Sequence, residues 1–300
     1  MNTFRVLLCG LGLAAPIFSL AAPSQLNGVQ SEQTLTIAKG PASRLTDVYT
    51  VPEGKKLVLE AGAQIAAEKD GKIVIKGELI VKGDDKAPVL MKGRKWKGIV
   101  IETEGKASIT GLQITGAMIA LEVNGNLPLI QQSVFSRNET GLLVQNSGTT
   151  EIDNVLFTEQ TGNGCFLSEK NVTVRNCSFI KNKGYGVQIS GTSPSFERCY
   201  FENNKAGIFL DGDGTSTKGN ECNFDSKSIG IESKVSHGSL RFLKCYWGEK
   251  STNQLKSKGV NTNLSNVKDA HDNSGSLKVV LTDFLTAAPQ PCGATVKSKL

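Results

Sequence analysis

The sequence predicts an all-β fold, a single-stranded right-handed parallel β-helix with about 22 residues in each turn of the solenoid. Three observations lead to this prediction. Short strands that begin with glycine or alanine recur at steps of 21 to 23 residues, and large apolar residues recur in step with them. Within each repeat, apolar and polar residues alternate over three to five positions and are interrupted by Gly, Asn, Ser and Thr. That pattern is typical of short strands joined by turns and excludes a helical-hairpin repeat.

The first recurring feature is a strand of the form Gly-apolar-x-apolar. These strands begin at Gly98, Ala120, Gly141, Gly164, Gly186, Gly207 and Gly230. In a strand the side chains alternate, so we expect the first and third residues after each start to point inward and the second and fourth to point outward. Each turn, or rung, exposes its backbone edge until the next rung covers it at about 4.8 Å, so the ends need caps.

Three apolar columns keep register with these strands and are expected to fill the core. One comprises Ile114, Phe135, Phe157, Phe179, Phe201, Phe224 and Trp247. Two residues earlier come Leu112, Ser133, Val155, Cys177, Cys199, Cys222 and Cys245. Five residues earlier come Ile109, Ile130, Ile152, Val174, Phe196, Gly219 and Phe242. The only lapses are Ser133 and Gly219.

Amide side chains form a fourth column, three residues after the aromatic positions. Its members are Asn138, Gln160, Asn182 and Asn204. An asparagine in a turn tolerates the left-handed conformation and hydrogen-bonds neighbouring backbone, and stacked amides bond one another. The alternative is an exposed, glycan-binding row.

The cysteine column is expected to pack as small hydrophobes in the core. Neighbouring rungs place Cα atoms about 4.8 Å apart, inside the disulfide range, so vertical bridges among Cys177, Cys199, Cys222 and Cys245 remain an open alternative. A metal thiolate site is disfavoured because a line of sulfurs is not a tetrahedron.

The N-terminus reads as a secretory signal. Arg5 precedes an apolar run from Val6 to Leu20, and small residues follow. We therefore expect residues 1–21 to be removed and the protein to be secreted or periplasmic, in an oxidising compartment. The alternative is a buried N-terminal helix. No later stretch is long enough to predict a membrane span. The net charge of +6 is spread along the chain, which indicates a solvated surface and no nucleic-acid partner.

The rest of the chain divides around the regular repeat. Residues 22–45 are expected to be weakly ordered, 46–97 to form less even N-terminal rungs, and 98–248 to form the regular rungs. Residues 249–300 are expected to form a C-terminal cap and tail. Within this segment, we expect residues 277–285 to form a strand that closes the C-terminal end and residues 287–300 to be weakly ordered.

Several segments resemble a known group of proteins. PEGKKLVLEAG, IVIKGELIVKG, WKGIVIE, CYWG and NVKDAHDN occur in this order. Over residues 46–290 the chain resembles right-handed β-helix repeat proteins of the pectin-lyase-like superfamily, nearest to its bacterial envelope members. The resemblance implies the fold. It implies no single activity, because the superfamily contains lyases, hydrolases, epimerases and non-catalytic proteins.

The outward second position of the Gly-x strands holds the candidate ligand-binding residues. Phe166 and Phe209 lie two rungs apart, roughly 10 Å, with Gln188 between them. Aromatic faces at this spacing suit a sugar chain. The alternative is that a loop or the C-terminal tail covers them.

The candidate catalytic and metal residues are Asp211, Asp213 and Glu232. We expect Glu232 to neighbour the Asp-Gly-Asp-Gly turn on the next rung, where these carboxylates suit calcium or the acid chemistry of glycoside hydrolysis. The alternative is ordinary turn chemistry. The resemblance implies that a lyase also needs an arginine, whereas the nearby bases are Lys205 and Lys234. The resemblance implies that a galacturonan hydrolase of this fold carries the motifs N-T-D, D-D, G-H-G and R-I-K together, and this sequence does not contain that combination.

The favoured functional hypothesis is therefore a non-catalytic secreted or periplasmic protein that binds a glycan or another envelope surface and needs no cofactor. The alternatives are a lyase or hydrolase of uronic-acid polymers, with calcium, and a structural spacer or assembly module. The sequence leaves the oligomeric state open.

Overall fold

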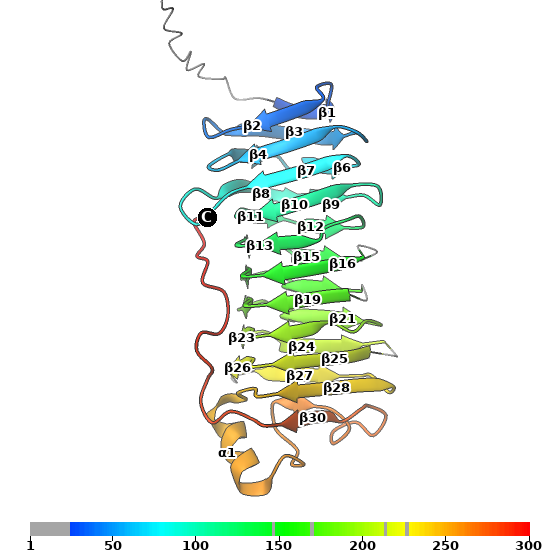
Figure 1. The fold of residues 1–300 in the computed structure, drawn as a ribbon, viewed down its shortest axis with the longest axis vertical. Coiled ribbons are helices and arrows are strands. Elements are labelled where there is room, and N and C mark those ends of the chain that lie inside the picture. Colours follow the sequence, from blue (N-terminus) through cyan, green and yellow to red (C-terminus); the bar gives the residue numbers. More distant parts are fainter. Residues whose placement is uncertain (1–24, 146–147, 169–170, 213–214, 226–227) are drawn as a thin grey trace, which may run out of the picture.

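The computed structural model describes residues 25–145, 148–168, 171–212, 215–225 and 228–300. The predicted signal lies outside these residues. The described chain forms a right-handed parallel β-solenoid, as predicted, and its rungs stack along one long axis (Figure 1). All pairings between its strands are parallel, and each rung contributes strands to three faces. Among the described residues, no helix is long and apolar enough to cross a membrane.

Face one is a sheet of 11 strands. Its strands are β2 (Thr34–Ile37), β4 (Lys56–Glu60), β7 (Glu78–Lys82), β10 (Lys106–Thr110), β13 (Leu129–Gln131), β16 (Thr149–Asp153), β19 (Asn171–Arg175), β22 (Ser195–Glu197), β25 (Thr215–Asn220), β28 (Gly238–Leu243) and β30 (Val279–Thr282).

Face two follows face one in every rung. Its strands are β5 (Gln64–Ala67), β8 (Val89–Trp96), β11 (Leu112–Ala117), β14 (Val134–Ser136), β17 (Leu156–Thr158), β20 (Ser178–Ile180), β23 (Tyr200–Glu202) and β26 (Asn223–Asp225). The inward residues of these strands carry the aromatic column.

Face three contains the Gly-x strands. Its strands are β6 (Lys72–Ile75), β9 (Gly98–Ile101), β12 (Ile119–Val123), β15 (Thr140–Val144), β18 (Cys165–Leu167), β21 (Val187–Ser190), β24 (Ala206–Asp211), β27 (Ile229–Ser233) and β29 (Val267–Lys268). The long strand β3 (Ser43–Val51) pairs with β5 of face two and with β6 of face three, so hydrogen bonding joins the two faces into one sheet of 19 strands, which also includes β1 (Gln25–Val29).

The aromatic column lies inside the coil, as predicted. Phe135, Phe157, Phe179, Phe201 and Phe224 are paired rung by rung, and Trp247 completes the stack. Consecutive ring centroids lie 4.6 to 5.3 Å apart, with interplanar angles of 2 to 11°. This spacing is the rung spacing itself, so the rings stack because the backbone ladder stacks.

The amide column is buried and forms a continuous hydrogen-bonded ladder. Each side-chain oxygen accepts the backbone N–H of the preceding member: Gln160 N donates to Asn182 Oδ1 at 3.1 Å, and Asn182 N donates to Asn204 Oδ1 at 3.1 Å. Each amide nitrogen donates to a carbonyl of the aromatic column one rung earlier, as Asn182 Nδ2 does to Phe157 O at 3.3 Å. These side chains satisfy turn backbone that would otherwise be buried without partners.

Ser133, which interrupts the cysteine column, makes the same hydrogen bond as the cysteines. The Cys177 thiol donates to Arg175 O, two residues earlier, at 3.0 Å, and Ser133 Oγ donates to Gln131 O at 2.8 Å. The four column cysteines are buried free thiols, so they pack as predicted without vertical disulfides. At the second lapse, a Cβ on Gly219 would lie 2.4 Å from Phe242 Cδ1, so the Phe242 ring occupies the missing side chain's space.

The two chain ends differ from the weakly ordered segments that we expected. Within residues 22–45 the structure forms β1 and β2, whose backbone pairs with β3 and β4 and whose Leu26 and Ile37 enter the core. Their short polar sequence concealed this, because the pairing comes from the rung that follows.

The C-terminal segment contains a helix that the sequence did not predict, α1 (Gly248–Lys258). It sits at the C-terminal end of the solenoid, where the predicted closing strand appears as β30, paired with β28 (Figure 1). Residues 287–300, here named the strap, then run back along the outside of face two toward the N-terminal rungs. Val296 is buried, and the strap's hydrogen bonds order it although it has no hydrophobic period of its own.

Candidate ligand-binding face

The outward column of face three has the register that the sequence predicts. The residues paired in succession are Val100, Glu122, Leu143, Phe166, Gln188, Phe209 and Glu232. Their inward neighbours, such as Leu121 and Ile208, are fully buried. The candidate residues Phe166, Gln188 and Phe209 therefore follow one another on three adjacent rungs.

Phe209 does not present a free aromatic face. It is only 5% exposed, because the ring of Tyr185 stacks on it with centroids 4.3 Å apart and an interplanar angle of 14°. The Lys234 ammonium lies 5.4 Å from the Phe209 centroid. Of the predicted alternatives, coverage by a loop residue is what the structure shows at this position, and the half-buried Tyr185 is the aromatic ring at the surface.

Tyr185 is held in place by polar and cationic neighbours. Its backbone N–H donates to Asn163 Oδ1 at 2.9 Å, and Lys205 Nζ lies 3.0 Å from its hydroxyl and 4.7 Å from its ring centroid. This hydrogen bond, helped by the charge of Glu232, raises the pKa of the Lys205 ammonium. Sequence reasoning missed Tyr185 because it lies in the turn before Gly186, outside every column.

The amides beside this ring are also oriented. Asn163 Nδ2 donates to Gln188 Oε1 at 2.8 Å. This hydrogen bond fixes the orientation of the Gln188 amide group, and with it the direction of the amide nitrogen. Phe166, one rung earlier, is partly exposed. We name the group Phe166, Asn163, Tyr185, Gln188 and Phe209 the aromatic–amide plate. It combines two partly exposed rings, Phe166 and Tyr185, one supporting ring, Phe209, and a pair of oriented amides, all carried on three strands and the two turns that contain Asn163 and Tyr185.

Of the predicted acidic residues, the structure describes Asp211 and Glu232, which lie on the neighbouring strands β24 and β27. Asp211 is exposed and pairs with Ser190, whereas Glu232 pairs with Phe209 and Lys268. The two carboxylates are offset by two positions along neighbouring strands because Glu232 follows the column of Phe209, not that of Asp211. Asp213 lies outside the described residues. Within the described part of the chain, no group of three His, Cys, Asp or Glu side chains is arranged to hold a metal ion.

The strap binds a different face. Its backbone bonds to outward side chains of face two and the adjoining corner: Ala294 N donates to Ser178 Oγ at 2.8 Å, and Lys299 N donates to Gln113 Oε1 at 2.7 Å. These contacts lie on β20 and β11, away from the outward column of face three.

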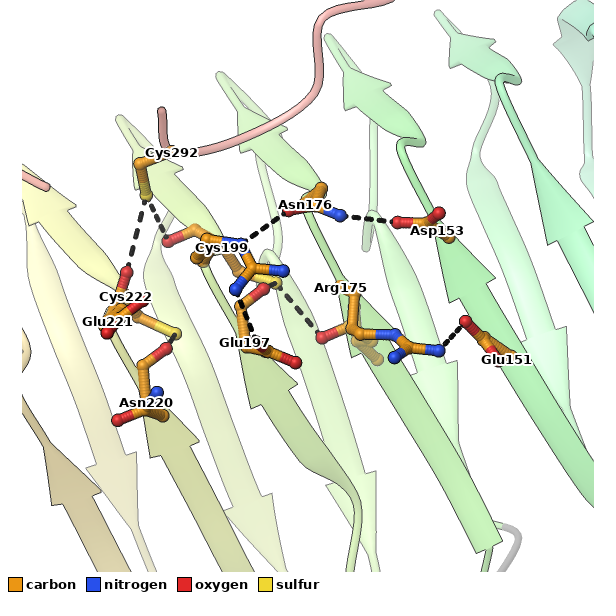
Figure 2. Close-up of polar contacts among 12 residues, drawn as sticks. Glu151, Asp153, Arg175, Asn176, Glu197, Cys199, Asn220, Glu221, Cys222 and Cys292 are labelled. Carbon is orange, nitrogen blue, oxygen red and sulfur yellow. Dashed lines mark hydrogen bonds and ion pairs between the residues drawn. The ribbon is translucent and has the colours of Figure 1, made fainter. Parts of the chain in front are cut away.

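Figure 2 shows the point where the strap meets the corner between faces one and two. The Cys292 thiol donates to Cys199 O at 3.3 Å, while Asn176 Nδ2 donates to Asp153 Oδ1 at 2.7 Å further along the same corner. Arg175 forms an ion pair with Glu151 beside it. The corner is thus already tied by its own polar contacts, which argues for a structural role there.

Comparison with known proteins gives one family match. Residues 97–245 match the family described as "Right handed beta helix region". Neither the curated proteins nor the solved structures contain a match to this chain.

Proposed function

Because this chain is a right-handed parallel β-helix protein of the pectin-lyase-like superfamily, we propose that it is a non-catalytic binding protein of the secreted or periplasmic type, which takes a glycan on face three. The observation that carries the proposal is the aromatic–amide plate. Binding sites usually combine aromatic surface with a few well-placed polar groups.

The plate suits a sugar ring for two physical reasons. The Tyr185 ring stacks on Phe209 and has the Lys205 ammonium over it, so the part of the ring that stays exposed is held in place at little conformational cost. The Gln188 and Asn163 amides are already oriented by their mutual hydrogen bond, and amides both donate to and accept from hydroxyl groups. The rungs are rigid, so little ordering is needed on binding.

The arrangement of the acidic side chains favours a binding function over a catalytic one. Glycoside hydrolysis needs two carboxylates on either side of one bond. Along its own column Asp211 pairs with Ser190, and Glu232 pairs with Phe209 and Lys268, so no second carboxylate lies directly opposite either of them.

The test is the substitution Tyr185→Ala, with Tyr246→Ala as the matched control on another corner. A glycan array with the wild-type protein first selects a ligand, and calorimetry then compares the variants. We expect Tyr185→Ala to weaken binding about tenfold, in the range of one lost aromatic contact, and Tyr246→Ala to leave it unchanged. Equal affinity for the wild type and Tyr185→Ala would remove the plate from the proposal.

The proposed location has its own test. Mass spectrometry of protein recovered from its native host should find a chain that begins close to residue 22. A chain that retains residues 1–21 would contradict secretion through a cleaved signal.

A further inference from the structure

A bulge in β8 directs two basic side chains outward at the corner between faces two and three. Thr115 pairs with Lys92 and Ala117 pairs with Trp96, so Gly93, Arg94 and Lys95 lie opposite the single residue Gly116. Bulges of this kind change the direction of side chains and bend the strand.

The core fixes this bulge in place. Trp96, directly after it, is fully buried, and its Nε1 donates to Thr115 O at 3.1 Å. On the other side, a Cβ on Gly116 would lie 2.0 Å from Gly93 O, so only glycine permits this approach of the two backbones. Arg94 and Lys95 are therefore exposed on a rigid support.

Two hollows flank the bulge and share Arg94 and Lys95. One, of about 560 Å³, lies toward Ala67 and Lys69. The other, of about 370 Å³, reaches Met118 and Arg137. Gly116 occupies the register position between Lys95 and Arg137, because Thr115 pairs with Ser136. Lys95 and Arg137 therefore lie two rungs, roughly 10 Å, apart, and the rung between them has a glycine and so no side chain at this position.

These cations are not neutralised by the protein. Lys97 pairs with Asp70 and Arg44 with Glu68, but among the described residues Arg94, Lys95 and Arg137 form no ion pair. Glu139 is the one acidic residue among the described residues that line the second hollow. Met118 is 48% exposed there and provides an apolar surface beside the charges.

We propose that this corner, the basic hollow, binds the oxyanion groups of an acidic polysaccharide. Guanidinium groups pair in a bidentate manner with carboxylate, sulfate and phosphate, and an uncompensated cluster of cations attracts polyanions. The exposed apolar side chain of Met118, which lines the same hollow, suits the body of a sugar ring. The inference rests on the proposed glycan-binding function but concerns a different surface of the solenoid, the corner around the bulge of β8.

The test compares ligands that share one backbone. Affinity for dextran, carboxymethyl-dextran and dextran sulfate is measured by calorimetry at low and high salt, and the two charged forms distinguish carboxylate from sulfate. The wild type should bind at least one charged form and weaken as salt rises. In Arg94→Ala/Lys95→Ala the affinity should fall at least tenfold and the salt dependence should decrease. Lys218→Ala/Arg241→Ala, which removes two exposed cations from face one, should bind as the wild type does.

Equal loss in the two double variants would overturn the site, because charge alone would then explain binding. Tighter binding of a DNA duplex than of either charged dextran, lost in Arg94→Ala/Lys95→Ala, would overturn the assignment to a polysaccharide. Tyr185→Ala separates the two proposals.

If only Tyr185→Ala loses the array-selected glycan, and the bulge variant Arg94→Ala/Lys95→Ala binds every ligand as the wild type does, the basic hollow alone is refuted. Loss of charged-dextran binding only in the bulge variant, with Tyr185→Ala unaffected on every ligand, refutes the plate alone.

Discussion

The N-terminal rungs and the regular rungs form one continuous coil with two different cores. At the position of the aromatic column, the N-terminal rungs place Ile65 and Met91 in register, followed by Ile114 of the first regular rung, whereas the later regular rungs place stacked phenylalanines such as Phe157 and Phe179. Aliphatic side chains adapt their packing to small displacements, while flat rings at 4.9 Å separation require constant register. The first kind of core therefore tolerates insertions, and the second keeps the period.

The polar ladders follow the same division. The amide column begins at Asn138, which accepts from Ala117 N at 2.9 Å, and continues only through the regular rungs. The bulge of β8 lies before it, in the aliphatic part, and the hollow beside the bulge extends to Arg137 and Asn138. The bulge thus belongs to the rungs that rings and amides do not stack.

The largest expected effect comes from the centre of the aromatic stack. Phe179→Ala should lower the free energy of unfolding by about 3–5 kcal/mol, because it opens a cavity and removes two ring contacts. Met91→Leu, at the equivalent position of the N-terminal rungs, should cost less than about 1.5 kcal/mol. Urea denaturation followed by circular dichroism measures both. Equal losses for the two variants would mean that the two cores do not differ in tolerance.

The distinction between the two cores also explains what the sequence predicts. The fold, the inward columns and the outward register of Phe166, Gln188 and Phe209 were predictable because each residue repeats once per rung. The covering of Phe209 by Tyr185 was not, because a turn residue has no column to reveal its direction. The different columns of Asp211 and Glu232 were predictable as well, because Asp211 is the fourth residue after Gly207 and Glu232 the second after Gly230.

The remaining surprises arise from tertiary contacts that carry no period. Helix α1 buries only Gly248, Ser251, Thr252 and Leu255, so its sequence has no recognisable apolar face. The strap is ordered by hydrogen bonds to side chains more than 100 positions away, such as that from Ala294 N to Ser178 Oγ. Order of this origin cannot be deduced from local composition.

A smaller effect is expected from the amide ladder. Asn182→Ala would leave the Gln160 N–H and the Phe157 carbonyl without their partners inside a buried turn. Each such loss costs about 1–3 kcal/mol, and part of it relaxes. Thermal unfolding should show a clear decrease for Asn182→Ala. The partly exposed Asn124→Ala on face three should remain within about 0.5 kcal/mol of the wild type. A neutral Asn182→Ala would show that the stacked rings alone maintain the register.

The smallest expected effect concerns the strap, which crosses both kinds of rung. Burial raises the pKa of the Cys292 thiol to about 12. Its ordinary value is about 8.5, so the reactive thiolate at pH 8 should be rarer by roughly a thousandfold than in a free cysteine. Alkylation at pH 8, followed by mass spectrometry, should therefore modify Cys292 slowly in the folded protein and rapidly in urea.

The same shift fixes the direction of the pH dependence. A folded pKa above the unfolded one means that the folded strap holds the proton more tightly, so its stabilising contribution is complete below about pH 8.5 and is lost as the pH rises toward about 12. Hydrogen exchange of the strap amides, such as that of Gly293, which donates to Arg198 O, should accelerate over this interval by more than the base catalysis of an unprotected amide explains. Cys292→Ser should remove the part of the acceleration that depends on the thiol. Rapid alkylation at pH 8, with the protection factors of the strap amides unchanged up to pH 11, would show instead that the strap is held by its backbone contacts alone and that the buried thiol contributes nothing to its attachment.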